Sequence, residues 1–325
     1  MLRKQIGKWI AVWVIAAITM FSAGSVIAAE PSKALYLKTI ETYPAPKLED
    51  VDGREYKFLV DPAKTSPAMA EAFKDLWTRV KSAAAKHGFT VTEKEKTPLK
   101  FEMYNKDYYD TSDQLLWNKG YLLRVTTRFK DGKPNSMVNV TVKSINEDVM
   151  RTLATPLEVV GVDKVNLSGK ESVGFGPGGK LGSYIEKDAS FVVAKDSLGK
   201  LTLGDFGKYM PELLKLGLPA DTALVETKVF TYKIKPGEVA LPGVEPCGIE
   251  MEAWSATDGG APYLYDVSFS YGDTDYYAIP ETHAAGEQFM FKVVRGELGG
   301  LAGADGDKWG GSKVRKLMNR PILVR

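Results

Sequence analysis

Charged or hydroxyl-bearing residues two or four positions apart recur in the strand-like segments of this 325-residue chain. In a β-strand, residues two apart point to the same side, so each such pair shares one face. Basic side chains on a face that becomes buried need anions, and Lys and Arg suit phosphate oxygens. Paired carboxylates can hold a hard divalent cation. The alternative is a solvated strand face, where alternating charge is ordinary. The residues in question are Glu55, Lys57, Arg124, Arg128, Thr141, Lys143, Glu250 and Glu252.

The sequence offers few residues for a disulfide, a zinc site, a Cys–His catalytic pair or a nucleotide-binding loop. One Cys and two His exclude an intramolecular disulfide, and they exclude a zinc site of four Cys or of two Cys and two His. Cys247 with His87 or His283 would be needed for a Cys–His catalytic pair, but nothing around them indicates one. Residues 174–180 fit G-x-G-x-x-G and nearly fit a phosphate-binding loop. We interpret them as a Gly-rich connection, because no buried strand is predicted before them and no helix after them.

Strands and helices must position these residues. Apolar residues at helical spacing predict one long helix over residues 67–87, and Asp258-Gly259-Gly260 predicts a hairpin turn. Many hairpin-linked strands with few helices indicate the α+β class, with an antiparallel sheet or barrel. The predicted strands are residues 55–60, 99–104, 121–129, 136–145, 156–162, 184–194, 223–235, 247–255 and 262–271. The predicted short helices are residues 112–119, 204–216, 281–295 and 307–318.

The first 29 residues have the features of an export signal. Three basic residues open the segment, an uncharged run covers residues 9–29, and small residues end that run before Glu30. This order is typical of a cleaved secretory signal peptide, which places the mature chain in the periplasm or outside the cell. An uncleaved signal would instead anchor the chain in a membrane, because the run has 21 residues. Residues 30–50, which mix Pro with charge, are predicted to be a linker.

The export signal also changes the charge balance. Without residues 1–29, the chain has 40 basic and 41 acidic residues, so the mature protein is nearly neutral. A nearly neutral chain has no general basic field for nucleic acid or for an anionic membrane surface. Nucleic acid is therefore not an expected partner, and any anion site must be a local cluster of Lys and Arg.

A series of motifs between residues 55 and 145 resembles a known family. The chain shows, in order, Glu55-Tyr56-Lys57, Tyr108-Tyr109-Asp110-Thr111, Gly120-Tyr121-Leu122-Leu123-Arg124 and Val140-Thr141-Val142-Lys143. These resemble the motifs of the CYTH domain, also called the triphosphate tunnel metalloenzyme family. The predicted long helix also falls where that family has one. The resemblance covers residues 55–145 and is weak beyond them.

The resemblance implies a fold and a ligand. The fold would be an eight-stranded, mainly antiparallel, tunnel-like β-barrel with flanking helices over residues 51–295, followed by a C-terminal helical extension over residues 296–325. The ligand would be a small molecule with a phosphate chain, such as a triphosphate, or inorganic polyphosphate. The family often cleaves it with water and Mg²⁺ or Mn²⁺. The implied metal-binding and catalytic residues are Glu55, Glu250 and Glu252. The implied phosphate-binding residues are Lys57, Arg124, Arg128, Lys143 and Lys228.

The chain departs from the family pattern at several positions. Gly53 stands where the first Glu of the opening strand would be, and Asp52 has the wrong strand parity to replace it. Thr126 stands where the family usually has a second Arg, and Asp266 is the only acidic residue of the late acidic strand. A weakened metal site with a retained basic wall favours anion binding over hydrolysis.

Two functions remain open at the level of the sequence. In the first, the chain is an exported CYTH-like protein that binds a triphosphate or polyphosphate and hydrolyses it with a divalent metal. In the second, it is a non-catalytic periplasmic anion-binding or scaffolding module on the same fold. The sequence alone does not decide whether the chain is an enzyme.

Overall fold

The computed structural model describes residues 51, 53–94, 99–145, 149–176, 179–272, 280–303 and 306–319. The predicted export signal and the predicted linker lie outside these residues. Within the described ranges, none of the helices combines the length and the apolar character that crossing a membrane requires.

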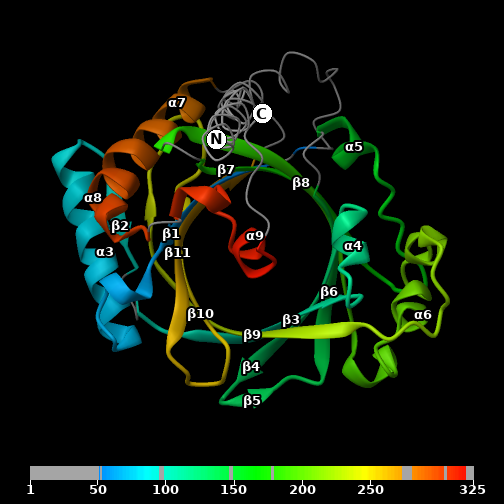
Figure 1. The fold of residues 1–325 in the computed structure, drawn as a ribbon. Coiled ribbons are helices and arrows are strands. Elements are labelled where there is room, and N and C mark those ends of the chain that lie inside the picture. Colours follow the sequence, from blue (N-terminus) through cyan, green and yellow to red (C-terminus); the bar gives the residue numbers. More distant parts are fainter. Residues whose placement is uncertain are drawn as a thin grey trace, which may run out of the picture.

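Nine strands close into a barrel (Figure 1). Around the barrel, the order is β1, β7, β8, β6, β4, β3, β9, β10 and β11, and β11 pairs with β1 to complete the circle. All neighbours are antiparallel except β1 and β7. The strands are β1 (Gly53–Val60), β3 (Glu102–Asp110), β4 (Tyr121–Lys130), β6 (Met137–Ile145), β7 (Val165–Phe175), β8 (Leu181–Ala194), β9 (Val225–Val239), β10 (Cys247–Ser255) and β11 (Pro262–Gly272). Two short strands, β2 (Val91–Glu93) and β5 (Lys133–Pro134), pair with β9 and β4.

The barrel confirms the predicted α+β fold class, but the expected number of eight strands is one too low. The prediction placed a strand at residues 156–162, whereas the strand in this region is β7 at Val165–Phe175. The outward positions of β7 include Gly169 and Glu171, so the strand lacks the apolar alternation that marks its neighbours. Gly174 and Phe175 end β7, and β8 begins at Leu181, so the Gly-rich stretch connects two strands. A buried strand therefore does precede it, contrary to the expectation, whereas a strand and not a helix follows it, as expected.

Helices cover the barrel on two sides (Figure 1). On one side, α3 (Met69–Lys86) packs with the helices after residue 280 against the outward residues of β1, β10 and β11. Phe73 of α3, for example, lies edge-on to Tyr265 of β11 with ring centroids 5.4 Å apart. On the other side, Leu203 and Phe206 pack against outward residues of β4, β6 and β8. The two largest apolar clusters therefore lie outside the barrel, and its interior is left for other side chains.

The helical elements are short apart from α3. The α-helices are α4 (Leu115–Asn118), α5 (Val149–Ala154), α6 (Leu203–Gly207), α7 (Pro280–Gln288), α8 (Gly296–Leu298) and α9 (Lys313–Leu317). The 3₁₀ turns are η2 (Pro62–Lys64), η4 (Lys195–Leu198), η5 (Pro211–Leu216), η8 (Gly299–Leu301) and η9 (Gly306–Trp309), and η7 (Phe289–Arg295) is a π-helical segment.

The C-terminal segment of residues 306–319 enters the barrel, and Figure 1 shows α9 inside the ring of strands. Trp309 and Met318 of this segment join an apolar cluster with inward residues such as Tyr108, Leu122 and Trp254. All the strand residues of that cluster lie near the same end of the barrel. The cluster and the C-terminal segment therefore fill this end, and the opposite end carries the residues around Glu102 and Arg128.

Candidate functional site

The barrel interior holds a polar cavity of about 320 Å³. Seven basic and five acidic side chains line it, so the lining has an excess of positive charge. The basic residues are Lys57, Lys106, Arg124, Lys143, Lys170, Lys233 and Lys313. The acidic residues are Glu55, Glu186, Asp188, Glu250 and Glu252.

Strand alternation places these side chains inside. On β4, Leu123 and Val125 pack into an outer apolar cluster, so Arg124 between them faces the cavity. The preceding motif fixes the start of that strand: the Asp110 carboxylate accepts hydrogen bonds from the backbone N–H groups of Leu116 and Trp117 at 2.8 and 3.0 Å. This carboxylate thereby satisfies free donors of the short helix α4, which leads into β4.

Six of the predicted site residues line the cavity together, namely Glu55, Lys57, Arg124, Lys143, Glu250 and Glu252. Thr141, which shares their parity, lines it as well. Their location agrees with the expected interior, whereas their roles in binding or catalysis remain predictions.

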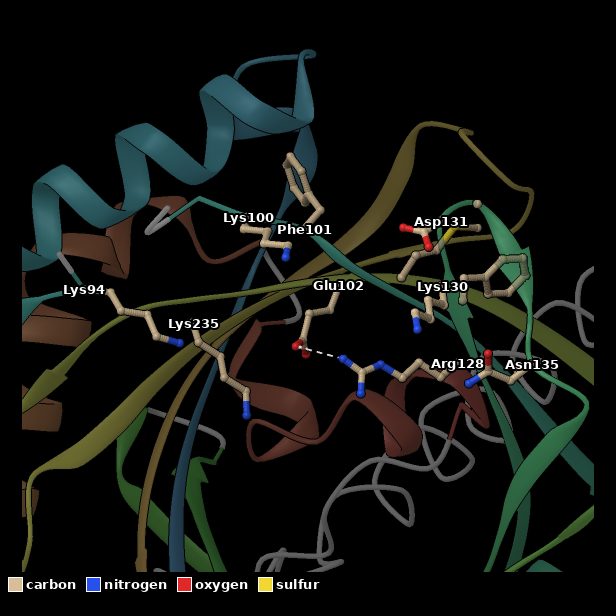
Figure 2. A pocket seen from close by; sticks show the side chains of 12 residues that line it. Lys94, Lys100, Phe101, Glu102, Arg128, Lys130, Asp131, Asn135 and Lys235 are labelled. Atoms are coloured by element: carbon tan, nitrogen blue, oxygen red, sulfur yellow. Dashed lines mark hydrogen bonds and ion pairs between the residues drawn. The ribbon is translucent and has the colours of Figure 1, made fainter. Parts of the chain in front are cut away.

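Two predicted residues lie elsewhere. Arg128 stands at the open end of the barrel, where a second hollow of about 810 Å³ is lined by several lysines (Figure 2). Its side chain is 60% exposed and reaches Glu102 at 3.4 Å. Lys228 is not a cavity residue: the adjacent Val229 faces the interior cluster, so Lys228 points outward, 3.3 Å from Glu226. The prediction located the correct strand and chose the wrong face.

Most of the basic side chains in the cavity are paired with carboxylates. Lys143 lies 2.7 Å from Glu186, and Lys57 lies 3.6 Å from Glu186 and 3.3 Å from Glu55. Burial alone would raise the pKa of Glu186, but Lys143 and Lys57 hold it well below its usual range. These lysines and Glu186 therefore remain charged in the interior.

A second network lies on the β10 side of the cavity. Glu250 bonds Lys233 at 2.7 Å and Lys235 at 3.0 Å, and Glu252 contacts Lys106. Burial lowers the pKa of Lys106 to about 8, and Glu252 opposes this shift. Lys313 contributes a further cation to Glu252 from the C-terminal segment.

Arg124 differs from these lysines because no carboxylate of the described residues lies within ion-pair distance. Its Nη2 donates to Thr141 Oγ1 at 3.3 Å, and its buried Nε has no hydrogen-bond partner among the residues that the structure describes. Lys170, which also lines the cavity, has no ion pair with a described carboxylate either. These two cations carry the positive charge that the cavity leaves unneutralised.

The predicted Mg²⁺ or Mn²⁺ ligands do not form a metal site in this arrangement. Glu55, Glu250 and Glu252 each bond to lysine nitrogens, and the described residues include no group of three His, Cys, Asp or Glu placed to hold a metal ion. A carboxylate neutralised by an ammonium group is a poor ligand for a second cation at the same oxygens. The residues present therefore do not fit the predicted metal.

The predicted site left out six charged cavity residues, although Lys233 had been considered beside Lys228 on the same strand. Some carried a readable signal, because Glu186 and Asp188 are two apart in a predicted strand and Lys106 shares the parity of Tyr108. Lys313 carried none, since its place depends on a tertiary contact of a segment predicted to be an extension. The missed residues are Lys106, Lys170, Glu186, Asp188, Lys233 and Lys313.

Comparisons with known proteins found similar solved structures. No family model matches the chain, and no curated protein matches it. A proposed adenylyl cyclase from Hippeastrum, reported to have a dominant triphosphatase activity, is 12% identical with a TM-score of 0.41, and the match covers 84% of this chain and 98% of that one. A proposed adenylate cyclase from Bacillus halodurans is 13% identical with a TM-score of 0.34, over 74% of this chain and 89% of that one. A Pyrococcus horikoshii OT3 protein is 12% identical with a TM-score of 0.30, and the match covers 73% of this chain and 89% of that one.

Proposed function

We propose that the chain binds a phosphate chain, such as a triphosphate or a stretch of polyphosphate, inside the barrel. The support comes from the cavity, which is lined by seven basic and five acidic side chains and filled at one end by the C-terminal segment. Phosphate chains carry several negative charges in a row, which suits a lined cavity better than a flat surface.

The observation that carries this proposal is the buried Nε of Arg124, which has no hydrogen-bond partner among the described residues. A guanidinium group whose Nε is buried without a partner is costly unless an anion satisfies it. Its planar fork of donors matches the geometry of phosphate oxygens. Thr141 and Lys143 stand beside it on β6, because Arg124 pairs with Thr141 and Leu122 with Lys143. The three side chains together present donors to one anion.

Binding without catalysis is the form of the function that the side chains favour. The carboxylates that would hold a metal are already bonded to lysines, so metal-assisted hydrolysis has no prepared site among the described residues. We retain the sequence-based proposal that residues 1–29 export the chain, which would make it a periplasmic or secreted anion-binding module.

The proposal is tested by calorimetric titration of the purified chain with tripolyphosphate. Arg124→Ala is expected to weaken binding by at least about tenfold, equivalent to about 1.4 kcal/mol. Lys228→Ala is the matched control, because it also removes one cation from a barrel strand, but on the outer face. Equal affinities of the two variants would contradict the assignment of Arg124. Phosphate release that requires Mg²⁺ would favour the hydrolase instead.

A further inference from the structure

Two carboxylates on neighbouring strands contact the ammonium group of Lys313, and a third acts on it from a greater distance. Glu252 on β10 and Asp266 on β11 are directly opposite each other in the sheet. The Lys313 Nζ lies 3.1 Å from Glu252 Oε2 and contacts Asp266 Oδ2. Glu55 on β1 also acts on Lys313 electrostatically. Two of these carboxylates, Glu252 and Asp266, are among the residues that the sequence places on the acidic strands.

Two adjacent buried carboxylates need a cation between them. The side chains of Glu252 and Asp266 are 3% and 1% exposed, so water cannot solvate their charge. Burial would lower the pKa of Lys313, but Asp266 and Glu252 raise it well above its usual range. The two carboxylates therefore favour the charged form of the Lys313 side chain.

The C-terminal segment holds Lys313 in place through contacts on both sides of it. Ser312 Oγ accepts a hydrogen bond from the Arg315 backbone N–H at 3.2 Å, and the Arg315 guanidinium lies over the Tyr184 ring at 5.0 Å. On the N-terminal side, Gly310 lies so close to Gly174 that a Cβ at Gly174 would come within 2.2 Å of the Gly310 carbonyl oxygen. Lys313 is thus fixed by the fold, unlike a surface lysine.

We propose that Lys313 is the resident cation of this carboxylate site and occupies the place that a divalent metal would take. Its ammonium group has three N–H donors. Two are directed to Glu252 and Asp266, and the third is available to a phosphate oxygen in the cavity that Lys313 lines. The site therefore binds phosphate chains without a metal ion. The phosphate part of this inference rests on the proposed function, whereas the metal part does not.

The metal part is tested with Mn²⁺ alone, by electron paramagnetic resonance of the free ion and without phosphate. The unmutated full chain and Lys313→Arg are expected to leave the signal of free Mn²⁺ unchanged. Lys313→Met removes the charge and keeps the apolar stem, so it is expected to bind one Mn²⁺ at least about tenfold more tightly than the unmutated chain. Adding Asp266→Asn to Lys313→Met is expected to remove that gain.

Thermal unfolding covers the case in which Lys313→Met folds poorly, since Asp266 would lack its cation and Glu252 would keep only Lys106. Mn²⁺ is expected to raise the melting temperature of Lys313→Met and not that of the unmutated chain. An unmutated chain that binds one Mn²⁺ as tightly as Lys313→Met would overturn the inference. So would a Lys313→Met variant that Mn²⁺ neither binds nor stabilises.

The phosphate part is tested by titrating the unmutated chain with tripolyphosphate in EDTA-treated buffer. Binding is expected there, because Lys313 replaces the metal. Binding that appears only when Mn²⁺ is supplied would refute the inference and leave the proposed function intact. Absence of binding in both buffers would refute the proposed function, and the Mn²⁺ titration would still decide the role of Lys313.

Discussion

Gly311 offers a direct test of how the C-terminal segment sits in the barrel. Its φ is +74°, and a Cβ placed on it would lie 2.5 Å from the Lys57 carbonyl oxygen and 2.8 Å from the Lys57 Cβ. Gly132, in the turn between β4 and β5, has the same φ of +74°, and no heavy atom of the described residues lies within 4 Å of such a Cβ. Gly132→Ala is therefore a matched control for the backbone strain alone.

Comparing the two variants separates the effect of backbone strain on the free energy of unfolding from the effect of overpacking. An alanine with positive φ costs about 1–2 kcal/mol, and both variants pay this cost. The lower entropy of the unfolded alanine chain also affects both variants equally. Gly311→Ala must in addition push the segment away from β1, and such overpacking costs about 1–3 kcal/mol. We therefore expect Gly311→Ala to lower the free energy of unfolding by about 1–3 kcal/mol more than Gly132→Ala.

Urea unfolding followed by tryptophan fluorescence measures both free energies, and the slopes show whether each variant unfolds in one step. The titration with tripolyphosphate adds a second readout, since a displaced segment carries Lys313 out of the cavity. If the two variants lose the same stability, the segment does not pack against β1 as described, and the role given to Lys313 would lose its geometric basis.

Two further predictions concern other carboxylates. Burial, and then Glu226, raise the pKa of Asp107 to about 6 from 3.8, so the folded chain loses stability as its carboxyl ionises with rising pH. Asp107→Asn is expected to be more stable than the unmutated chain by about 2–3 kcal/mol at about pH 8, and to lose this advantage near about pH 4. Urea unfolding at both pH values measures the difference. An advantage that does not depend on pH would show that the raised pKa of Asp107 is not its cause. Glu186→Gln frees Lys57 and Lys143 from their shared carboxylate and is expected to tighten tripolyphosphate binding about threefold or more in calorimetry; weaker binding by a folded variant would show that Glu186 orients these lysines for the ligand.

The sequence predicts the inner face of most strands because alternation is a local property. Arg124 could be placed inside from its apolar neighbours Leu123 and Val125, which need an outer core. Lys228 was misplaced although its strand is predicted correctly, because the prediction overlooked that Lys228 shares the parity of the apolar residues Phe230, Tyr232 and Ile234, which mark the outer face. β7 was missed for a different reason, because a glycine and a buried Glu171 stand at outward positions.

The ion-pair partner of a buried charged residue cannot be predicted from strand alternation. Glu252 was predicted to lie inside, and it does, but the prediction gave it a metal where the structure gives it Lys106 and Lys313. Those lysines are 146 and 61 positions away along the chain. Only the closed barrel and the inserted segment bring them to Glu252, so no local pattern indicates the pairing.

A lysine and a metal ion solve the same electrostatic problem with different consequences. Either one neutralises adjacent buried carboxylates such as Glu252 and Asp266, and either one presents positive charge to a phosphate oxygen. A metal ion is recruited from solution, so its site depends on supply and can be emptied by a chelator. Lys313 is covalently part of the chain, and it reaches the site only when the C-terminal segment folds into the barrel. Under the proposed function, completion of the anion site is therefore coupled to folding of residues 306–319 and not to the supply of a metal ion.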